Sequence, residues 1–486
     1  MERVADATGG DGTGEEMTDR QRTLAFVTVL IALVLEVADS TIVNTALPVI
    51  RQTLGASPAA MQWIVAGYLL VLGSLLLLGG RLGDAFGYRR MFLIGVAAFI
   101  ATSMLCGMAH TPQQLVVARL LQGGAGAMMG PQVMAIVQIL FTPLERVARL
   151  AWFGVIGGLA AIVGPIIGGL LIEANLLGLG WRLIFLINLP IGLLALWLGV
   201  RTIPHKDVGH RLRVDLAGAA LFAIGFAGLL LALIDGAEHG WPAWTLLSAA
   251  VGLAAILSGW RRAVARRRDG LSAMIEPTLF RLRTFRWGLL AILTFAASAA
   301  GFLLVLAVTL QQGLGKSPLA TALLHMPFGL GVMAGISLIG KRYLPRFGRW
   351  LLVSGATVMA IGGALALALL AQGIGGGVEL IALLGLAGMG MGMIAGPLPP
   401  VVVADVDRAF AGTASATLRT AQQIGGALGI ALIGSAFFAG ASGEGAGRLS
   451  GLLPAGVVFV MLLLLSCVAA LRLPGDIFGT RGGRER

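Results

Sequence analysis

The sequence is poor in charged residues and in cysteine. Only 12% of its 486 residues are charged and 57% are hydrophobic, whereas soluble globular domains average about 25% charged and about 45–50% apolar residues. This composition excludes an ordinary water-soluble fold. The two cysteines, Cys106 and Cys467, both lie in apolar runs, so they predict neither a disulfide framework nor a metal site. We interpret them as small buried hydrophobic residues.

The sequence also lacks the short motifs of common catalytic sites. It contains no Gly-x-Ser-x-Gly elbow, no GxxxxGK[ST] phosphate loop and no HExxH pair, so nucleotide hydrolysis and metalloproteolysis have no visible site. The net charge of +12 does not indicate nucleic-acid binding, because the basic residues are scattered between apolar segments. We therefore expect neither an enzyme nor a cofactor. An integral membrane enzyme acting on lipids is a remote alternative, since no catalytic constellation lies near an interface.

What the chain does contain is a series of long apolar runs. Each is about 20 residues or longer, enough to cross a hydrocarbon core of ~30 Å. The runs are continuously apolar rather than alternating, which favours helices over the strands of a barrel. We expect fourteen membrane-spanning helices, near residues 23–47, 60–80, 91–110, 113–140, 149–172, 183–201, 214–234, 245–261, 287–311, 318–340, 350–372, 378–403, 411–440 and 451–471.

The distribution of lysine and arginine predicts how these spans are oriented. Cytoplasmic loops of membrane proteins carry an excess of these residues. With the N-terminus in the cytoplasm, the predicted outside loops hold only Arg51, Arg182, Lys316 and Arg448, and nearly all other basic residues fall inside. An even number of spans then places both termini in the cytoplasm. The basic segment 262–286 is either a surface-lying segment on anionic lipid or a solvated linker.

Ionisable residues inside the spans are the candidates for function, since each costs about 2.5–3.5 kcal/mol at a helix centre. In the first span, Glu36, Asp39, Ser40 and Asn44 share an arc of roughly 140° at 3.6 residues per turn. This arc should face protein or water. We interpret Asp39 as a proton carrier, because desolvation raises the affinity of a carboxylate for protons. The alternative is an acid permanently paired, for example with Arg119.

Two arginines also lie within spans. Arg119 is too deep for comfortable snorkelling and needs an acceptor, and Gln122 lies close to it on the same helix face. Arg419 is a second buried candidate, or else it snorkels to the cytoplasmic surface. His325 is interpreted as a hydrogen-bonded packing residue rather than a titrating one.

Glycine-rich stretches mark two further candidate sites. Gly164, Pro165, Gly168 and Gly169 in the fifth span predict a close-packed, bent helix that acts as a hinge or seal, or is a plain packing motif. The loop GRLGDAFGYRR places one acid among arginines between glycines that permit tight turns. It predicts an ion-paired clasp between spans, formed by Gly80, Arg81, Gly83, Asp84, Gly87, Arg89 and Arg90.

Several of these stretches together resemble the major facilitator superfamily, and within it the fourteen-span drug/proton antiporter family of the EmrB/QacA type. GRLGDAFGYRR resembles the signature loop between spans two and three, and ARLLQGGAGA resembles the fourth-span motif that contains the family arginine. IVGPIIGG resembles the fifth-span motif of antiporters. The remaining matches are DSTIVNTALP, QWIVAGYLL, WRLIFLINLPIG and GTASATLRTAQQIGGALG, so the resemblance covers residues 23 to about 472.

The resemblance implies an all-helical membrane protein with a defined domain order. It places a disordered cytoplasmic tail at 1–22, a six-helix bundle at 23–201, two extra spans and a basic loop at 202–286, a second six-helix bundle at 287–472 and a tail at 473–486. The two bundles are related by a pseudo-two-fold axis. The expected location is the cytoplasmic membrane of a bacterium, with lipid, protons and a small molecule as partners; a periplasmic adaptor and an outer-membrane channel are partners that the resemblance leaves open.

The resemblance also implies a function and residue roles. The expected activity is proton-driven export of hydrophobic compounds, including cations, by alternating access, with the proton gradient as energy source and no cofactor. The alternative is an exporter of the same fold for one defined metabolite. Asp39 would take part in proton coupling with Arg119, the Asp84 loop would steady one conformation, and the fifth-span glycines would control closure. The second-half loop GKRYLPRFGR lacks an equivalent acid, so the clasp is expected on one side only, and Glu36 indicates either a cationic substrate or a second proton site.

Overall fold

The computed structural model describes residues 17–205, 215–271, 273–407, 410–441 and 449–474. The outer parts of the two predicted tails, 1–16 and 475–486, therefore lie outside the described residues. The described residues form helices and loops without a strand. Fourteen helical segments are long and apolar enough to cross a membrane, which confirms the fourteen spans that the apolar runs predict.

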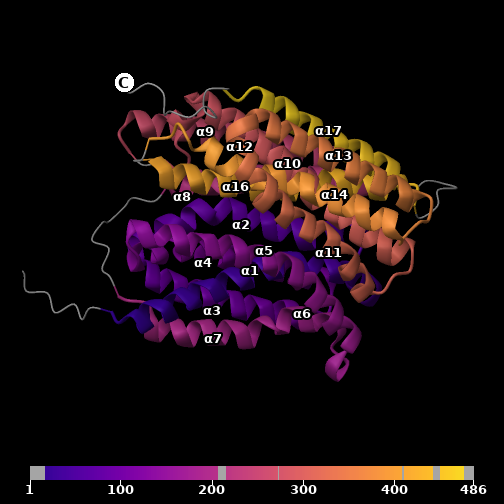
Figure 1. Cartoon of the computed structure of the whole chain (residues 1–486), viewed down its shortest axis with the longest axis horizontal. Coiled ribbons are helices and arrows are strands. Elements are labelled where there is room, and N and C mark those ends of the chain that lie inside the picture. Colours follow the sequence, from indigo (N-terminus) through magenta and orange to yellow (C-terminus); the bar gives the residue numbers. More distant parts are fainter. Residues whose placement is uncertain (1–16, 206–214, 272, 408–409, 442–448, 475–486) are drawn as a thin grey trace, which may run out of the picture.

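The helices of the N-terminal part lie beside those of the C-terminal part with their long axes roughly aligned (Figure 1). The N-terminal half, named here for its position in the chain, contains α1 (Asp19–Leu54), α2 (Pro58–Phe86), α3 (Tyr88–Gly107), α4 (Pro112–Leu140), α5 (Pro143–Ala174), α6 (Leu183–Leu186) and α7 (Asn188–Thr202). The short 3-10 turns η1 (Leu176–Gly178) and η2 (Gly180–Arg182) lead into α6. The sixth span is thus built from η2, α6 and α7 together.

The C-terminal half follows after the pair α8 (Leu216–His239) and α9 (Ala243–Arg268) and the 3-10 turn η3 (Pro277–Arg281). It contains α10 (Arg283–Val308), α11 (Pro318–Ala334), α12 (Lys341–Phe347), α13 (Arg349–Ala371), α14 (Val378–Ala395), α15 (Leu398–Val402), α16 (Ala411–Ala441) and α17 (Leu452–Leu471). Helix α10 continues into a π turn, η4 (Thr309–Gly313), and α11 continues into η5 (Gly335–Gly340).

Local sequence explains where several helices begin. Helices α2, α4 and α11 each start with proline after a serine or threonine, at Ser57, Thr111 and Ser317, whose side chain accepts a hydrogen bond from the first turn. A hydroxyl at the N-cap satisfies a free N–H group, and proline at the next position has no N–H group to satisfy. These starts are therefore determined by two adjacent residues, independently of tertiary packing.

Glycine explains how closely the helices pack. A Cβ atom on Gly79 of α2 would collide with the carbonyl oxygen of Ala127 in α4, and one on Gly429 of α16 would collide with that of Ala297 in α10. Small residues allow membrane helices to approach without a hydrophobic force between them. Glycines at such positions thus allow close packing of neighbouring helices.

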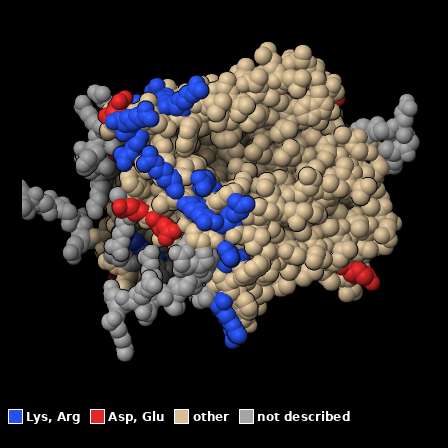
Figure 2. Space-filling model, turned by 90° about the horizontal axis from the view of Figure 1, so that it is seen from above, with Lys and Arg blue, Asp and Glu red and all other residues tan. Residues whose placement is uncertain are grey.

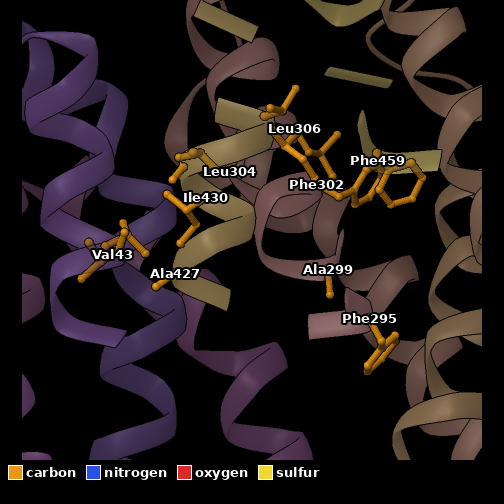
Figure 3. Close-up of a cluster of buried hydrophobic side chains, with 14 of the residues drawn as sticks. Val43, Phe295, Ala299, Phe302, Leu304, Leu306, Ala427, Ile430 and Phe459 are labelled. Atoms are coloured by element: carbon orange, nitrogen blue, oxygen red, sulfur yellow. The ribbon is translucent and has the colours of Figure 1, made fainter. Parts of the chain in front are cut away.

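The two halves share an apolar core. Val43 of α1 lies toward Ala427 and Ile430 of α16, and Phe302 of α10 stacks on Phe459 of α17 with ring centroids 5.1 Å apart (Figure 3). The extra pair joins both halves as well. Asp235 of α8 accepts a hydrogen bond from the Trp63 indole of α2 at 2.8 Å, and the carbonyl group of Leu233 accepts one from Ser435 of α16.

Charge is concentrated at one end of the molecule. Lysines and arginines gather toward one end in Figure 2, whereas most of the remaining visible surface consists of uncharged residues. We call this the basic end; α1, α5, α10 and α13 begin there. Arg283 and Arg349 donate to the carbonyl groups of Arg472 and Leu471 at the end of α17. A bilayer requires an uncharged band of protein surface of this kind between two polar ends.

Candidate functional site

Asp39 lies inside the N-terminal half, fully removed from the surface. Its carboxylate is bound by side chains from two other helices, α4 and α7. Oδ2 accepts a hydrogen bond from Nη1 of Arg119, and Oδ1 accepts from the amides of Gln122 at 3.0 Å and Asn188 at 2.9 Å. Asp39 is 1% exposed and Arg119 0% exposed. Every one of these partners donates, so both carboxyl oxygens of Asp39 act as acceptors.

Arg119 is held by more than this ion pair. Its Nε donates to the carbonyl group of Ile64 at 3.1 Å, and Nη1 also donates to Gln122 at 2.7 Å. The guanidinium lies 4.1 Å from the ring centroid of Tyr68, a cation–π contact. Its Nη2 is buried without a hydrogen-bond partner in the described part of the chain. Asp39 is thus paired with Arg119 in this structure, an arrangement that both a proton carrier and a permanently paired acid could adopt.

Two residues of this network were missed in the sequence. Asn188 and Ser103 connect α7 and α3 to the ion pair, since Ser103 accepts hydrogen bonds from Gln122 at 3.1 Å and Asn188 at 2.9 Å. Both are polar residues in otherwise apolar spans, and that signal was available. Nothing in the sequence, however, indicates that they meet the same carboxylate.

Glu36 points in a different direction from Asp39. It lines a cavity of about 180 Å³ between the halves, together with Val37, Ser40, Leu72, Leu76, Arg419, Gln422 and Gln423. Glu36 also rests against α4, because a Cβ on Gly130 would lie 2.8 Å from its Oε2. Asn44 is not among these lining residues, and its buried Oδ1 has no hydrogen-bond partner among the described residues. The predicted polar arc is therefore divided between the cavity and the interior.

At the end opposite the basic end, the halves are joined by polar contacts. Arg51 donates to Gln312 at 2.9 Å, Gln311 donates to the carbonyl group of Thr45 at 2.9 Å, and Glu173 accepts from the backbone N–H of Leu319 at 3.0 Å.

The glycines of the fifth span allow α5 to pack closely on α1 and on α11. A Cβ on Gly164 would lie 2.8 Å from Thr41, one on Gly168 would lie 2.5 Å from Ile42, and one on Gly169 would lie 2.7 Å from Leu319.

Pro165 lies within α5, whose helix continues to Ala174. The predicted motif thus lies where α5 packs on α1 and on α11 of the other half. Both the seal and the packing interpretation are compatible with this position.

The residues of the predicted clasp lie within the N-terminal half, where the ion pair of Asp84 and Arg81 stays within α2 and a hydrogen bond from Tyr88 makes the contact with α3. Asp84 lies 4.0 Å from Arg81 and accepts a hydrogen bond from the Tyr88 hydroxyl at 2.7 Å. Arg89 donates to the carbonyl group of Val200 in α7. Gly87 has φ +92°, a conformation that side chains disfavour. Exposed ion pairs of this kind contribute little stability.

Two further details complete the clasp region. Gly83 gives space to the amide of Gln132 in α4, which donates to the carbonyl group of Gly79 at 2.8 Å. Gly80 lies beside Pro131 of α4, and the exposed Arg90 makes no polar side-chain contact among the described residues. His325 contacts the carbonyl group of Thr321 at 2.7 Å on its own helix. Among the described residues no group of histidine, cysteine and acidic side chains could hold a metal ion.

Comparison with known proteins gives consistent relatives. A family model described as Major Facilitator Superfamily matches residues 29–215 and 214–430. The chain is 38% identical to the probable actinorhodin transporter of Streptomyces coelicolor over 89% of this chain and 75% of that one. It is 37% identical to the puromycin resistance protein pur8 of Streptomyces alboniger, over 85% and 82% of the two chains. The multidrug resistance protein Stp of Mycobacterium tuberculosis is 30% identical, over 86% and 76%.

Solved structures share the fold at low sequence identity. A bacterial homologue of the human lysosomal transporter Spinster superposes with a TM-score of 0.67 at 17% identity, covering 94% of this chain and 98% of that one. A POT peptide transporter in complex with sulfate superposes with a TM-score of 0.66 at 16% identity, covering 93% and 95%.

Proposed function

The chain belongs to the major facilitator superfamily, and from this premise we propose that it exports small organic molecules of the antibiotic or drug type in exchange for protons. It is a multi-pass protein of the cell membrane and a transporter rather than an enzyme. Its relatives include a probable actinorhodin transporter, a puromycin resistance protein and a multidrug resistance protein, which supports this substrate class. The basic end is the cytoplasmic side in this proposal, in keeping with the positive-inside rule.

The main support for proton coupling in this proposal is the buried ion pair of Asp39 and Arg119. A charge in a low-dielectric interior is stable only while its partner is present. Protonation of Asp39 would cancel its charge and weaken its bond to Arg119. Since the network reaches α1, α3, α4 and α7, weakening it changes how these helices pack.

The cycle then follows from population shift. With Asp39 ionised, the halves meet at the end opposite the basic end and line a cavity at Glu36 and Arg419. Protonation would favour the other arrangement, because in the present one a neutral Asp39 leaves the buried Arg119 guanidinium without its anion. The gradient supplies about 1.36 kcal/mol per pH unit and about 2.3 kcal/mol per charge per 100 mV.

Transport by purified protein in liposomes tests this proposal. The fluorescent cation ethidium serves as substrate, and two assays are compared: accumulation driven by an imposed pH gradient, and exchange of ethidium across the membrane without a gradient. Asp39→Asn should abolish gradient-driven accumulation while exchange continues, because exchange needs no proton.

A matched control comes from a second acid within a span. Asp235 bonds to Trp63 away from the ion pair, so Asp235→Asn should retain gradient-driven accumulation. Accumulation by the Asp39→Asn protein at the natural rate would remove Asp39 from the coupling. Failure of the natural protein to respond to a pH gradient would refute proton-driven export itself.

A further inference from the structure

The cavity between the halves has side chains of opposite charge on its two walls. Glu36 comes from α1 of the N-terminal half and Arg419 from α16 of the C-terminal half, and both are partly exposed. Unlike Asp39 and Arg119, these two form no direct ion pair with each other in the described part of the chain. The cavity thus holds an acid and a guanidinium apart.

The rest of the lining is suited to an amphipathic molecule. Ser40, Gln422 and Gln423 provide neutral hydrogen-bonding groups, and Gln422 is exposed although it lies within a long membrane helix. Leu72 and Leu76 of α2 form an apolar wall. Ligand sites commonly combine an apolar surface with a few polar groups that fix orientation.

We propose that this cavity binds dipolar amphipathic molecules. The cationic group of the molecule contacts Glu36, its anionic group contacts Arg419, and its apolar body packs on Leu72 and Leu76. This assignment rests on the proposed function, because it names the substrate class of the exporter's central cavity. It extends that function, since a hydrophobic cation alone would use only one of the two charged walls.

Electrostatics favours this class over a simple cation or anion. In a cavity of about 180 Å³, a cation that pairs with Glu36 is also repelled by Arg419, and an anion on Arg419 is repelled by Glu36. A molecule with both charges gains one attraction at each wall, and these attractions exceed the two cross repulsions because each charge lies nearer to its partner than to the like charge. Arginine also provides a planar pair of donors that matches a carboxylate.

The placement of the two charges also connects binding to movement. Glu36 and Arg419 belong to different halves, so a dipolar ligand bridges them. A ligand shifts an equilibrium by its differential affinity for the two states. The bridged state draws the walls together around the ligand, which a molecule held by one half alone does not do.

Binding of three naphthalene probes of similar size tests the proposal. The first carries a trimethylammonium and a carboxylate group, the second only the trimethylammonium, and the third only the carboxylate. Affinities are measured by calorimetry on the full chain in lipid nanodiscs, without any gradient. We expect the dipolar probe to bind at least tenfold more tightly than either singly charged probe.

Two single variants test which charged side chain of the cavity contacts which charged group of the probe. Glu36→Gln should remove the advantage of the dipolar probe over the carboxylate probe, and Arg419→Gln should remove its advantage over the ammonium probe. Glu379→Gln and Arg281→Gln change exposed charges elsewhere and should leave all three affinities unchanged. Equal affinity of the dipolar and ammonium probes for the natural protein, unaltered by Arg419→Gln, would overturn the proposal.

A double variant that exchanges the charges of Glu36 and Arg419 distinguishes loss of the binding site from failure to fold. The protein carrying both Glu36→Arg and Arg419→Glu keeps one charge of each sign, so it should again prefer the dipolar probe, bound in the reverse direction. Loss of that preference in a folded double variant would also contradict the proposal. Because no gradient is present, a failure of proton coupling in the liposome assay leaves these affinities unaffected, and the two failures can be told apart.

Discussion

Removal of the Arg119 guanidinium should destabilise the protein far more than removal of a surface arginine. Arg119→Met leaves the Asp39 carboxylate buried at 1% exposure, with only the Gln122 and Asn188 amides as donors. Breaking a buried pair by removing one partner costs about 3–5 kcal/mol. Asp39→Asn should cost a similar amount, since it leaves a buried guanidinium without its anion.

The double variant Asp39→Asn with Arg119→Met should cost much less than the sum of the two single changes. No isolated charge remains, so we expect a coupling free energy of about 3 kcal/mol, or roughly a hundredfold in the folding equilibrium. Unfolding in mixed micelles with increasing dodecyl sulfate, followed by circular dichroism, measures all four proteins. Arg349→Met removes a partly exposed arginine that donates to the carbonyl groups of Leu471 and Leu473 and should cost about 1 kcal/mol.

The pattern across the natural protein and its four variants decides the outcome. Additive costs, or a cost of Arg119→Met no larger than that of Arg349→Met, would mean that the ion pair is not buried as the structure places it. The proposed role of protonation would then lose its physical basis, because neutral Asp39 would change little.

Two other perturbations have defined outcomes. Gly429→Leu should prevent accumulation of folded protein, because a side chain there meets the backbone of Ala297, and fluorescence size-exclusion chromatography measures that yield. At the basic end, burial raises the pKa of Asp215, but the hydrogen bonds from Arg262 and the Gly218 N–H, with the nearby positive charge, bring it below its usual value. This stabilisation is present above about pH 4 and is lost as the pH falls through the lowered pKa. Thermal midpoints between pH 3 and pH 7 should therefore fall more steeply in the natural protein than in Asp215→Asn, and parallel curves would exclude the contribution.

The spans were predictable because their determinants are local. The length of an apolar run can be counted directly in the sequence, and an N-cap residue such as Ser57 before Pro58 acts within one helical turn. The fourteen spans are confirmed, and the motifs around Arg119 and Asp84 indicated the family that the comparisons show. The pairing of Arg119 with Gln122 also followed from spacing along one helix.

The candidate site could be predicted only in part. Glu36 and Asp39 are three residues apart, about 60° around a helix, which is too small an angle to say from sequence that one reaches the cavity and the other the interior. That division depends on where α4 and α7 lie beside α1. Asn188 can be recognised in the sequence as a polar residue within an apolar span, but its hydrogen-bond partners cannot.

What the sequence by itself determined is the number of spans and the family, because hydrophobic length and motif order are properties of neighbouring residues. Only the tertiary structure decided that Asp39 is paired with Arg119 and that Glu36 faces Arg419 across a cavity. These contacts join residues 80 and more positions apart. They depend on how the glycine-rich helices pack, and that packing is a property of the whole bundle.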